Sequence, residues 1–292
     1  MSDLRSWRDA QAALSPALAA ASLAFGALDE RLRGADQWQR LHLALLEATA
    51  ISRHVGDRVA LHRVTLCHGE GSASQGDAVD RAVQAVNRLM RPAGEDLADR
   101  IACDCRSGPR GTAPLHHMVT AAWGFACRQA YWEIDRTDPA SGDEKAARQD
   151  RLADAVVTAA RIGARAGRGG ALFLPLTLGG GQGLRAHDNA EAALTDWVET
   201  VEAGALVALA QLDRLAAWRS RAIAATGALS GRVPGRLIGA LAARPVVSAA
   251  LAEAASGASR AAVQRNLDRL VDLGLIREIT GRGRYRLWTA VL

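Results

Sequence analysis

Apolar residues recur every three to four positions along most of the chain, which is the spacing of one face of an amphipathic helix. The longest such pattern places Leu194, Trp197, Val201, Leu212 and Leu215 on one buried side. Short breaks divide the patterned region, and the predicted helices cover residues 15–33, 36–52, 77–90, 115–135, 144–166 and 188–225.

Cap residues stand where helices of these lengths should begin. Ser15 followed by Pro16 is a typical helix start, and Asp188 or Asn189 can cap the long helix. Aromatic residues are only 4% of the chain, whereas Ala and Leu are frequent, so helices are favoured over strands. We therefore expect a mainly α fold.

The stretch TGALSGRVPG, residues 226–235, has three Gly and one Pro and no periodicity, which is typical of a linker. A chain of 292 residues also exceeds the usual size of one compact domain. These features predict an α-helical body over residues 1–225, a linker over 226–234 and a second domain over 235–292.

The second domain has the element order of a winged helix-turn-helix. Helices are predicted over residues 236–243, 249–255 and 260–273, with Ser248 and Ser259 as caps and Gly274 closing the third helix. Alternating residues then predict two strands, 275–280 and 284–290, joined by the turn 281–283. Helix, helix, turn, helix and hairpin is the order that places a recognition helix in the major groove of DNA.

The third helix of this domain is amphipathic. Val263, Leu267 and Leu270 share the face that would pack against Leu241 and Leu251. Its opposite face and the following hairpin carry side chains suited to base edges and phosphates. The predicted DNA-binding residues are Ser259, Arg260, Gln264, Arg265, Arg269, Arg282, Arg284 and Arg286. Asp268 and Asp272 lie on the same outer side, would repel phosphate and argue against this interpretation.

Charge is concentrated in the same segment. Residues 232–292 hold ten Arg and four acidic residues, a formal charge of +6, while the whole chain carries +5. Positive charge confined to one small segment is typical of a nucleic-acid-binding module, although an arginine-rich solvated surface is the alternative. We expect double-stranded DNA as the partner.

Other candidate chemistry is weak. Cys103 and Cys105 are one residue apart, which is too close for a structural zinc pair, and the apolar surroundings of Cys127 favour a buried thiol over a nucleophile. The glycines of 179–183 lack the Lys-Ser/Thr of a phosphate-binding loop and are expected to form a flexible loop. We expect no metal, no cofactor and tryptophans that belong to the core.

Neither a signal-peptide pattern nor a run of eighteen apolar residues occurs in the chain. The sequence therefore predicts a cytoplasmic protein without a membrane span, in which the cysteines are free thiols.

The C-terminal segment resembles the tail of Fic-domain proteins. The residues that carry the resemblance are Arg244 and Pro245, SRAA at 259–262, LVDLGL at 270–275 and REITGRGRYR at 277–286. ALFLPLTLGG at 171–180 is similar to a run in a group of uncharacterised, often plasmid-borne alphaproteobacterial proteins. That group joins a Fic-like helical body to a helix-turn-helix, so the resemblance implies the same arrangement here.

Fic enzymes transfer a nucleotide monophosphate to a protein hydroxyl. The resemblance would imply this activity only if the catalytic signature of the family were present. The signature is a His, a Phe, an acidic residue and Gly-Asn-Gly-Arg, but His116 and His117 are followed by MVTAAWGFACR. Gly56 stands where the related inhibitory motif has Glu, four residues after Ser52. The resemblance therefore implies a catalytically inactive body.

Three functions follow from these patterns. The first is a DNA-binding protein that regulates transcription, with a Fic-like body used for homodimerisation or partner docking. The second is a divergent Fic-type nucleotidyl (AMP) transferase that uses His116 or His117. The third is a protein-interaction module whose winged helix does not bind DNA.

We predict that the purified protein transfers no nucleotide to protein hydroxyls. A histidine base without a preorganised phosphate cradle leaves the reaction close to its uncatalysed rate, because electrostatic stabilisation is usually the larger effect. Incubation with labelled ATP, CTP, GTP and UTP and lysate proteins measures this. Label transfer that disappears in His116→Ala or His117→Ala would instead establish the enzyme.

Overall fold

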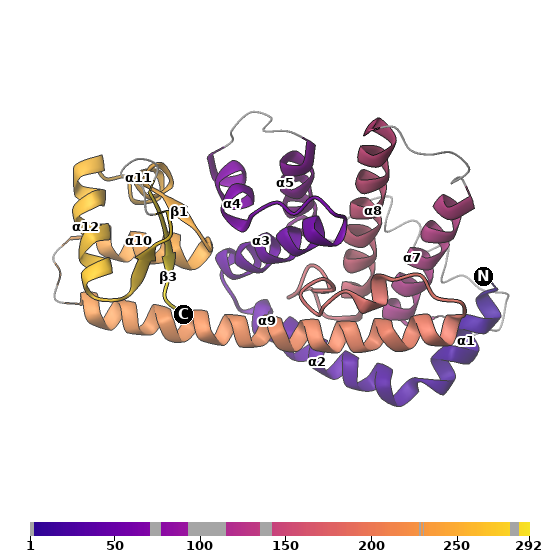
Figure 1. Cartoon of the computed structure of the whole chain (residues 1–292). Coiled ribbons are helices and arrows are strands. Elements are labelled where there is room, and N and C mark those ends of the chain that lie inside the picture. The colour runs from indigo at the N-terminus through magenta and orange to yellow at the C-terminus, as the bar shows by residue number, and fades with distance from the viewer. Residues whose placement is uncertain are drawn as a thin grey trace. The chain divides into compact units, whose positions relative to one another are not determined.

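The computed structural model describes residues 3–70, 77–92, 115–134, 142–227, 229, 231–280 and 286–292, with the side chains of 131–134 and 142 left out (Figure 1). The fold is mainly α, as predicted. The helices of the N-terminal part are α1 (Leu4–Ala13), α2 (Ser15–Arg33), α3 (Gln37–His54), α4 (Leu61–Glu70), α5 (Asp77–Leu89), α7 (His117–Ile134) and α8 (Gly142–Gly163).

A helix of 37 residues, α9 (Ala190–Thr226), follows, after two 3₁₀ turns at Ala164–Ala166 and Gln182–Leu184. The C-terminal elements are α10 (Val233–Ala243), β1 (Val247–Ser248), α11 (Ala249–Ser256), α12 (Arg260–Asp272), β2 (Ile276–Glu278) and β3 (Leu287–Ala290). Among the described residues, no helix alone has the length and hydropathy of a membrane span, and α1 and α2 reach them only as a pair bent by 80°.

Residue contacts divide the chain into two compact units. The first contains residues 1–35, 50–58 and 87–209, and the second contains 36–49, 59–86 and 210–292. Both α3 and α9 contribute residues to each unit. The C-terminal elements therefore share a unit with helices from the N-terminal part, and the domain boundary expected at 226–234 stays a prediction.

In the first unit, α7 packs on α8, and a buried carboxylate anchors the loop before the Gly-rich segment. The two oxygens of Asp29 accept hydrogen bonds from the backbone of Arg168 at 2.7 Å and Ala171 at 2.8 Å. A β-carbon at Gly179 would lie 2.2 Å from the carbonyl oxygen of Thr200 on α9. This close approach to α9 explains why the loop needs glycine there.

The core of the second unit combines apolar side chains of α9, α10, α11, α12 and the small sheet. Its antiparallel strands lie in the order β1-β3-β2, with Ile276 opposite Ala290 and Val247 opposite Trp288. The core residues are Leu215, Trp218, Ala222, Leu237, Ile238, Leu241, Ala242, Val247, Leu251, Ala252, Val263, Leu267, Leu270, Leu275, Ile276 and Trp288.

Trp218 of α9 is fully buried in this core, and its indole Nε1 donates a hydrogen bond of 2.7 Å to the carbonyl oxygen of Leu275. That carbonyl also accepts from the backbone N–H of Val291 at 3.0 Å. The indole therefore joins the last third of α9 to the segment between α12 and β2.

Most predicted elements are observed within two or three residues of their expected ends, and Trp197 and Trp218 are buried as expected. The predicted cap at Ser15 is wrong. Ser15 is the first residue of α2, Leu14 is the N-cap, and the Ser15 hydroxyl donates to the carbonyl of Ala12 because α1 ends directly before it. The elements α1, α4 and β1 were not predicted from the sequence.

We predict that Trp218→Phe lowers the free energy of unfolding by about 1–2 kcal/mol. The substitution removes a buried hydrogen bond and some core volume, while the Leu275 carbonyl keeps its bond to Val291. Urea unfolding followed by circular dichroism measures the loss. The comparison variant is Trp38→Phe, whose partly buried indole packs against the same core but donates to Asp36 at an exposed site, so its loss should be smaller than that of Trp218→Phe. Equal losses in the two variants would contradict the role given to Trp218.

Candidate nucleic-acid interface

Two capped helices and a tight turn form the predicted helix-turn-helix. The Ser248 hydroxyl caps α11 by accepting from the Leu251 N–H at 3.1 Å, and the Ser259 hydroxyl caps α12 by accepting from Ala262 at 3.4 Å. Gly257 adopts a φ of +63° in the turn between them, where residues with a β-carbon are strained. These local features fix where the start of α12 lies relative to α11.

The exposed start of α12 carries the side chains that the sequence predicted to read DNA. Ser259, Arg260 and Arg265 are exposed, and Arg269 is exposed further along the helix. Gln264 is partly buried, and its amide Nε2 donates to the Asp268 carboxylate at 2.7 Å. The predicted residues Arg282 and Arg284 lie outside the described residues.

Arg286, the last predicted DNA-binding residue, is engaged within the protein. Its Nε donates to the Glu278 carboxylate at 2.6 Å, and its Nη1 lies 3.6 Å from the Asp268 carboxylate. Its guanidinium also lies 5.3 Å from the ring centre of Trp288. The side chain thus links the residue before β3 to β2 and α12.

These contacts concern Asp268, one of the two acidic residues of α12 that argue against DNA binding. The Asp268 carboxylate accepts from Gln264 and shares the Arg286 guanidinium with Glu278, so its charge is partly offset within the unit. The side chain of Asp268 is half exposed, so the pair contributes no more than about 1 kcal/mol to stability. Its main effect is to reduce the repulsion that a DNA phosphate would experience at this face.

A hollow of about 610 Å³ lies beside the start of α12. The hollow is lined by residues from four elements. They are Leu66 and Glu70 of α4, Ser248 and Ala249 at the start of α11, Arg260 and Gln264 of α12, and Arg286, Leu287 and Trp288 at β3. The Ser248 hydroxyl donates to the Glu70 carboxylate at 2.5 Å. The helix α4 was not predicted from the sequence, although Leu61 and Val64 in LHRVTLCHGE have helical spacing.

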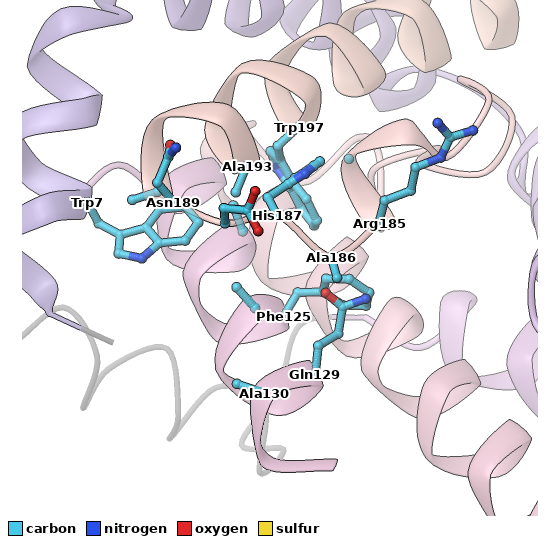
Figure 2. Close-up of a pocket in the computed structure, with 15 residues that line it drawn as sticks. Trp7, Phe125, Gln129, Ala130, Arg185, Ala186, His187, Asn189, Ala193 and Trp197 are labelled. Carbon is cyan, nitrogen blue, oxygen red and sulfur yellow. The ribbon is translucent and has the colours of Figure 1, made fainter. Parts of the chain in front are cut away.

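A second pocket, of about 350 Å³, lies within the first unit (Figure 2). Trp7, Phe125 and Trp197 form aromatic walls, and Asn189 caps α9 at its edge by accepting from Ala192 at 2.9 Å. Figure 2 shows the guanidinium of Arg185 directed away from the aromatic side chains.

The candidate bases do not line this pocket. His116 Nδ1 accepts from the backbone N–H of Met118 at 3.3 Å, at the start of α7, and Arg128 pairs with Asp154 at 3.4 Å. Of the glycine run, only Gly183 is among the described residues that line the pocket. The structure thus does not bring the histidines and the glycine run together there.

The described cysteines are free thiols. Burial raises the pKa of the Cys67 thiol and of the Cys127 thiol, which keeps both protonated and weakly reactive near neutral pH. Cys103 and Cys105 lie outside the described residues. Within the described part of the chain, no three His, Cys, Asp or Glu side chains gather as metal ligands would.

A buried histidine connects α3, α9 and α10 in the second unit. His42 is 2% exposed, its Nδ1 lies 3.0 Å from the carbonyl oxygen of Ala242, and its Nε2 lies 3.4 Å from Gln211 Nε2. A carbonyl can only accept, so Nδ1 carries the proton and Nε2 accepts from the Gln211 amide. The neutral ring therefore satisfies both partners, and burial lowers the pKa of His42 to about 4.

Comparison with known families places a DNA-binding domain at this site. Residues 234–291 match the family described as HTH DNA binding domain. The match begins in α10 and extends just past β3, so it includes α11, α12 and the sheet. A search of curated proteins found no match to the chain.

We predict that the second unit loses stability as the pH falls from about 6.5 to 4, the range between the unfolded and folded pKa values of His42. In this range the unfolded chain binds a proton at residue 42 and the folded protein does not, so the free energy of unfolding falls by about 1.4 kcal/mol per pH unit. Above about pH 6.5, the pKa of this histidine in the unfolded chain, His42 makes its full contribution to the free energy of unfolding.

Urea unfolding of the wild type and His42→Gln at several pH values measures this contribution, because effects of other groups cancel in the difference. The stability advantage of the wild type should shrink as the pH falls. The control is His62→Gln, at a partly exposed position on α4, which should follow the wild-type profile. Parallel profiles for wild type and His42→Gln would show that His42 does not carry the effect.

Proposed function

We propose that this chain binds double-stranded DNA as a transcriptional regulator, through a winged helix-turn-helix in which α12 enters the major groove. The match of residues 234–291 to the HTH DNA binding domain carries this proposal. It is supported by the exposed polar side chains of α12, because a recognition helix presents such side chains to base edges and to the flanking phosphates.

The side chains of α12 divide into two roles in this proposal. Arg265 and Gln264 read base edges, since Arg pairs with guanine and the Gln amide with adenine in the major groove. To reach a base, the Gln264 amide leaves Asp268, whose carboxylate keeps Arg286 as its neighbour. Ser259, Arg260 and Arg269 contact phosphates on either side of the groove.

The segment between β2 and β3 forms the wing. The two strands are antiparallel neighbours, and the backbone N–H of Ile279 donates to Leu287 at 2.9 Å, which extends the ladder toward the connection. The arginines at 282 and 284 in this connection would contact the phosphate backbone. Arg286 would hold the base of the wing against α12 through its contacts with Glu278 and Asp268.

The Fic-like body serves in this proposal as a catalytically inactive scaffold, used for homodimerisation or partner docking. The absence of the Gly-Asn-Gly-Arg loop from the sequence supports this, because that loop holds the phosphates in the enzymes that the chain resembles. The contact of His116 with the start of α7 also supports a structural use of this ring.

DNA affinity should fall steeply with salt. Binding that releases about four counterions loses about a hundredfold in affinity between 50 and 200 mM salt. Fluorescence anisotropy with random and genomic duplexes measures this salt dependence. The full chain is used because Trp218 of α9 belongs to the core of the DNA-binding unit.

Arg265→Ala and Gln264→Ala should relax the preference at one base pair by about 1–3 kcal/mol, whereas Arg284→Ala should weaken binding to all sequences alike and reduce the salt slope by about 0.9.

The matched control for the arginine variants is Arg214→Ala, an exposed arginine of α9 outside the matched domain, which should leave affinity and slope unchanged. If Arg265→Ala and Arg284→Ala behave alike, the placement of α12 in the major groove is wrong. If the full chain does not bind DNA even at 50 mM salt, the protein-interaction module is the better interpretation.

A further inference from the structure

The last turn of α4 lies against the first helix of the helix-turn-helix. A β-carbon at Gly69 would be 2.7 Å from Leu251 Cδ2 and 3.1 Å from Arg244 Nε, so a larger residue would displace these side chains. α4 contacts both α11 and β1, and Leu66 packs against the core of the second unit. The contact is therefore a packed interface within one unit.

This interface covers the N-terminus of α11. The first helix of a helix-turn-helix crosses the DNA backbone, and helix N-termini with a serine cap are common partners of phosphate oxygens. In this structure the hydroxyl of Ser248 donates instead to the carboxylate of Glu70 at 2.5 Å. An anionic oxygen of the protein thus occupies the place that a DNA phosphate oxygen would take.

The same helix also forms a wall of the hollow beside α12. Leu66 and Glu70 share this 610 Å³ hollow with Arg260 and Gln264, two of the side chains proposed to meet DNA. A duplex that approaches the N-terminal ends of α11 and α12 together would enter this space. DNA and α4 would then compete for one surface.

The surroundings of Arg244, beneath α4, also favour such a competition. The Nε of Arg244 is buried against Gly69 and has no hydrogen-bond partner among the described residues. Burial lowers the pKa of Arg244, which means that water is a better environment than this one for its charge. Departure of α4 would expose this charge close to the N-terminus of α11.

We propose that α4 is an intramolecular competitor of DNA, in which Glu70 takes the place of a backbone phosphate at α11 and Leu66 anchors the helix over the start of α12. The proposal rests on the DNA-binding function proposed above. DNA binds the population in which α4 has left this surface, so the apparent affinity of the full chain is reduced by the fraction of undocked molecules.

Two variants of the full chain separate this competition from a simple change of charge. Glu70→Ala removes the phosphate substitute, and Leu66→Ala weakens the docking of α4 without changing any charge. Each should tighten binding to one duplex by about five- to tenfold in fluorescence anisotropy at fixed salt. The control is Asp77→Asn, an exposed acid on α5 of the same unit, which should change affinity by less than about twofold.

Hydrogen exchange of the wild type gives a readout that does not depend on any variant folding correctly. Saturating duplex should speed exchange of the amides at 64–70 while it slows exchange at 260–272. If the amides of α4 become protected instead, α4 belongs to the DNA interface and the competition is refuted. The competition is also refuted if Leu66→Ala binds no more tightly than the wild type, or if Glu70→Ala and Asp77→Asn tighten binding alike.

The two proposals fail in different ways. If the wild type binds DNA with the expected salt dependence and both α4 variants bind with the same affinity as the wild type, only the role of α4 is overturned. Absence of binding at 50 mM salt in the wild type and in both α4 variants overturns the DNA-binding function, and the competition falls with it.

Discussion

The burial of one indole from α9 within the core of the C-terminal elements is the interaction on which the second unit depends. Trp218 supplies apolar area to that core, and its N–H satisfies the carbonyl of Leu275 at the point where the chain leaves α12. Burying a side chain of this size contributes several kcal/mol, more than any surface ion pair of the unit. A helix from outside the matched HTH domain therefore completes its interior.

Charge at the DNA-facing side is arranged around this core. The guanidinium of Arg286 donates to Glu278 and faces Asp268, so one positive charge is shared by two of the four acidic residues in the C-terminal segment. The exposed arginines at 260, 265 and 269 form no ion pair with another described residue. Among the described residues, three exposed arginines of this face therefore lie on α12.

The long helices and the order of the C-terminal elements could be predicted because their information is local. The apolar spacing of α9, the serine caps at 248 and 259 and the left-handed glycine at 274 are all visible within a few residues. The exposed start of α12 follows from the same pattern.

What could not be predicted depends on residues far apart in the chain. The contact between Glu70 and Ser248 joins positions 178 residues apart, and α4 has only ten residues, preceded by Ala60, whose side chain has no group that could cap a helix. The use of Arg286 also escaped prediction, because a strand arginine near a basic turn suggests phosphate binding until the position of Glu278 is known. The glycines at 179–183 suggested flexibility, whereas the approach of Gly179 to Thr200 requires their small size.

The second unit is assembled from three separate stretches of the chain, 36–49, 59–86 and 210–292. During synthesis, the first two stretches leave the ribosome more than a hundred residues before the last one. Their apolar faces must wait for α9 to α12 before they are covered, and this long-range closure slows folding relative to local helix pairing. The helix-turn-helix therefore matures only after residues 210–292 have been synthesised, however early the other two stretches of its unit are made.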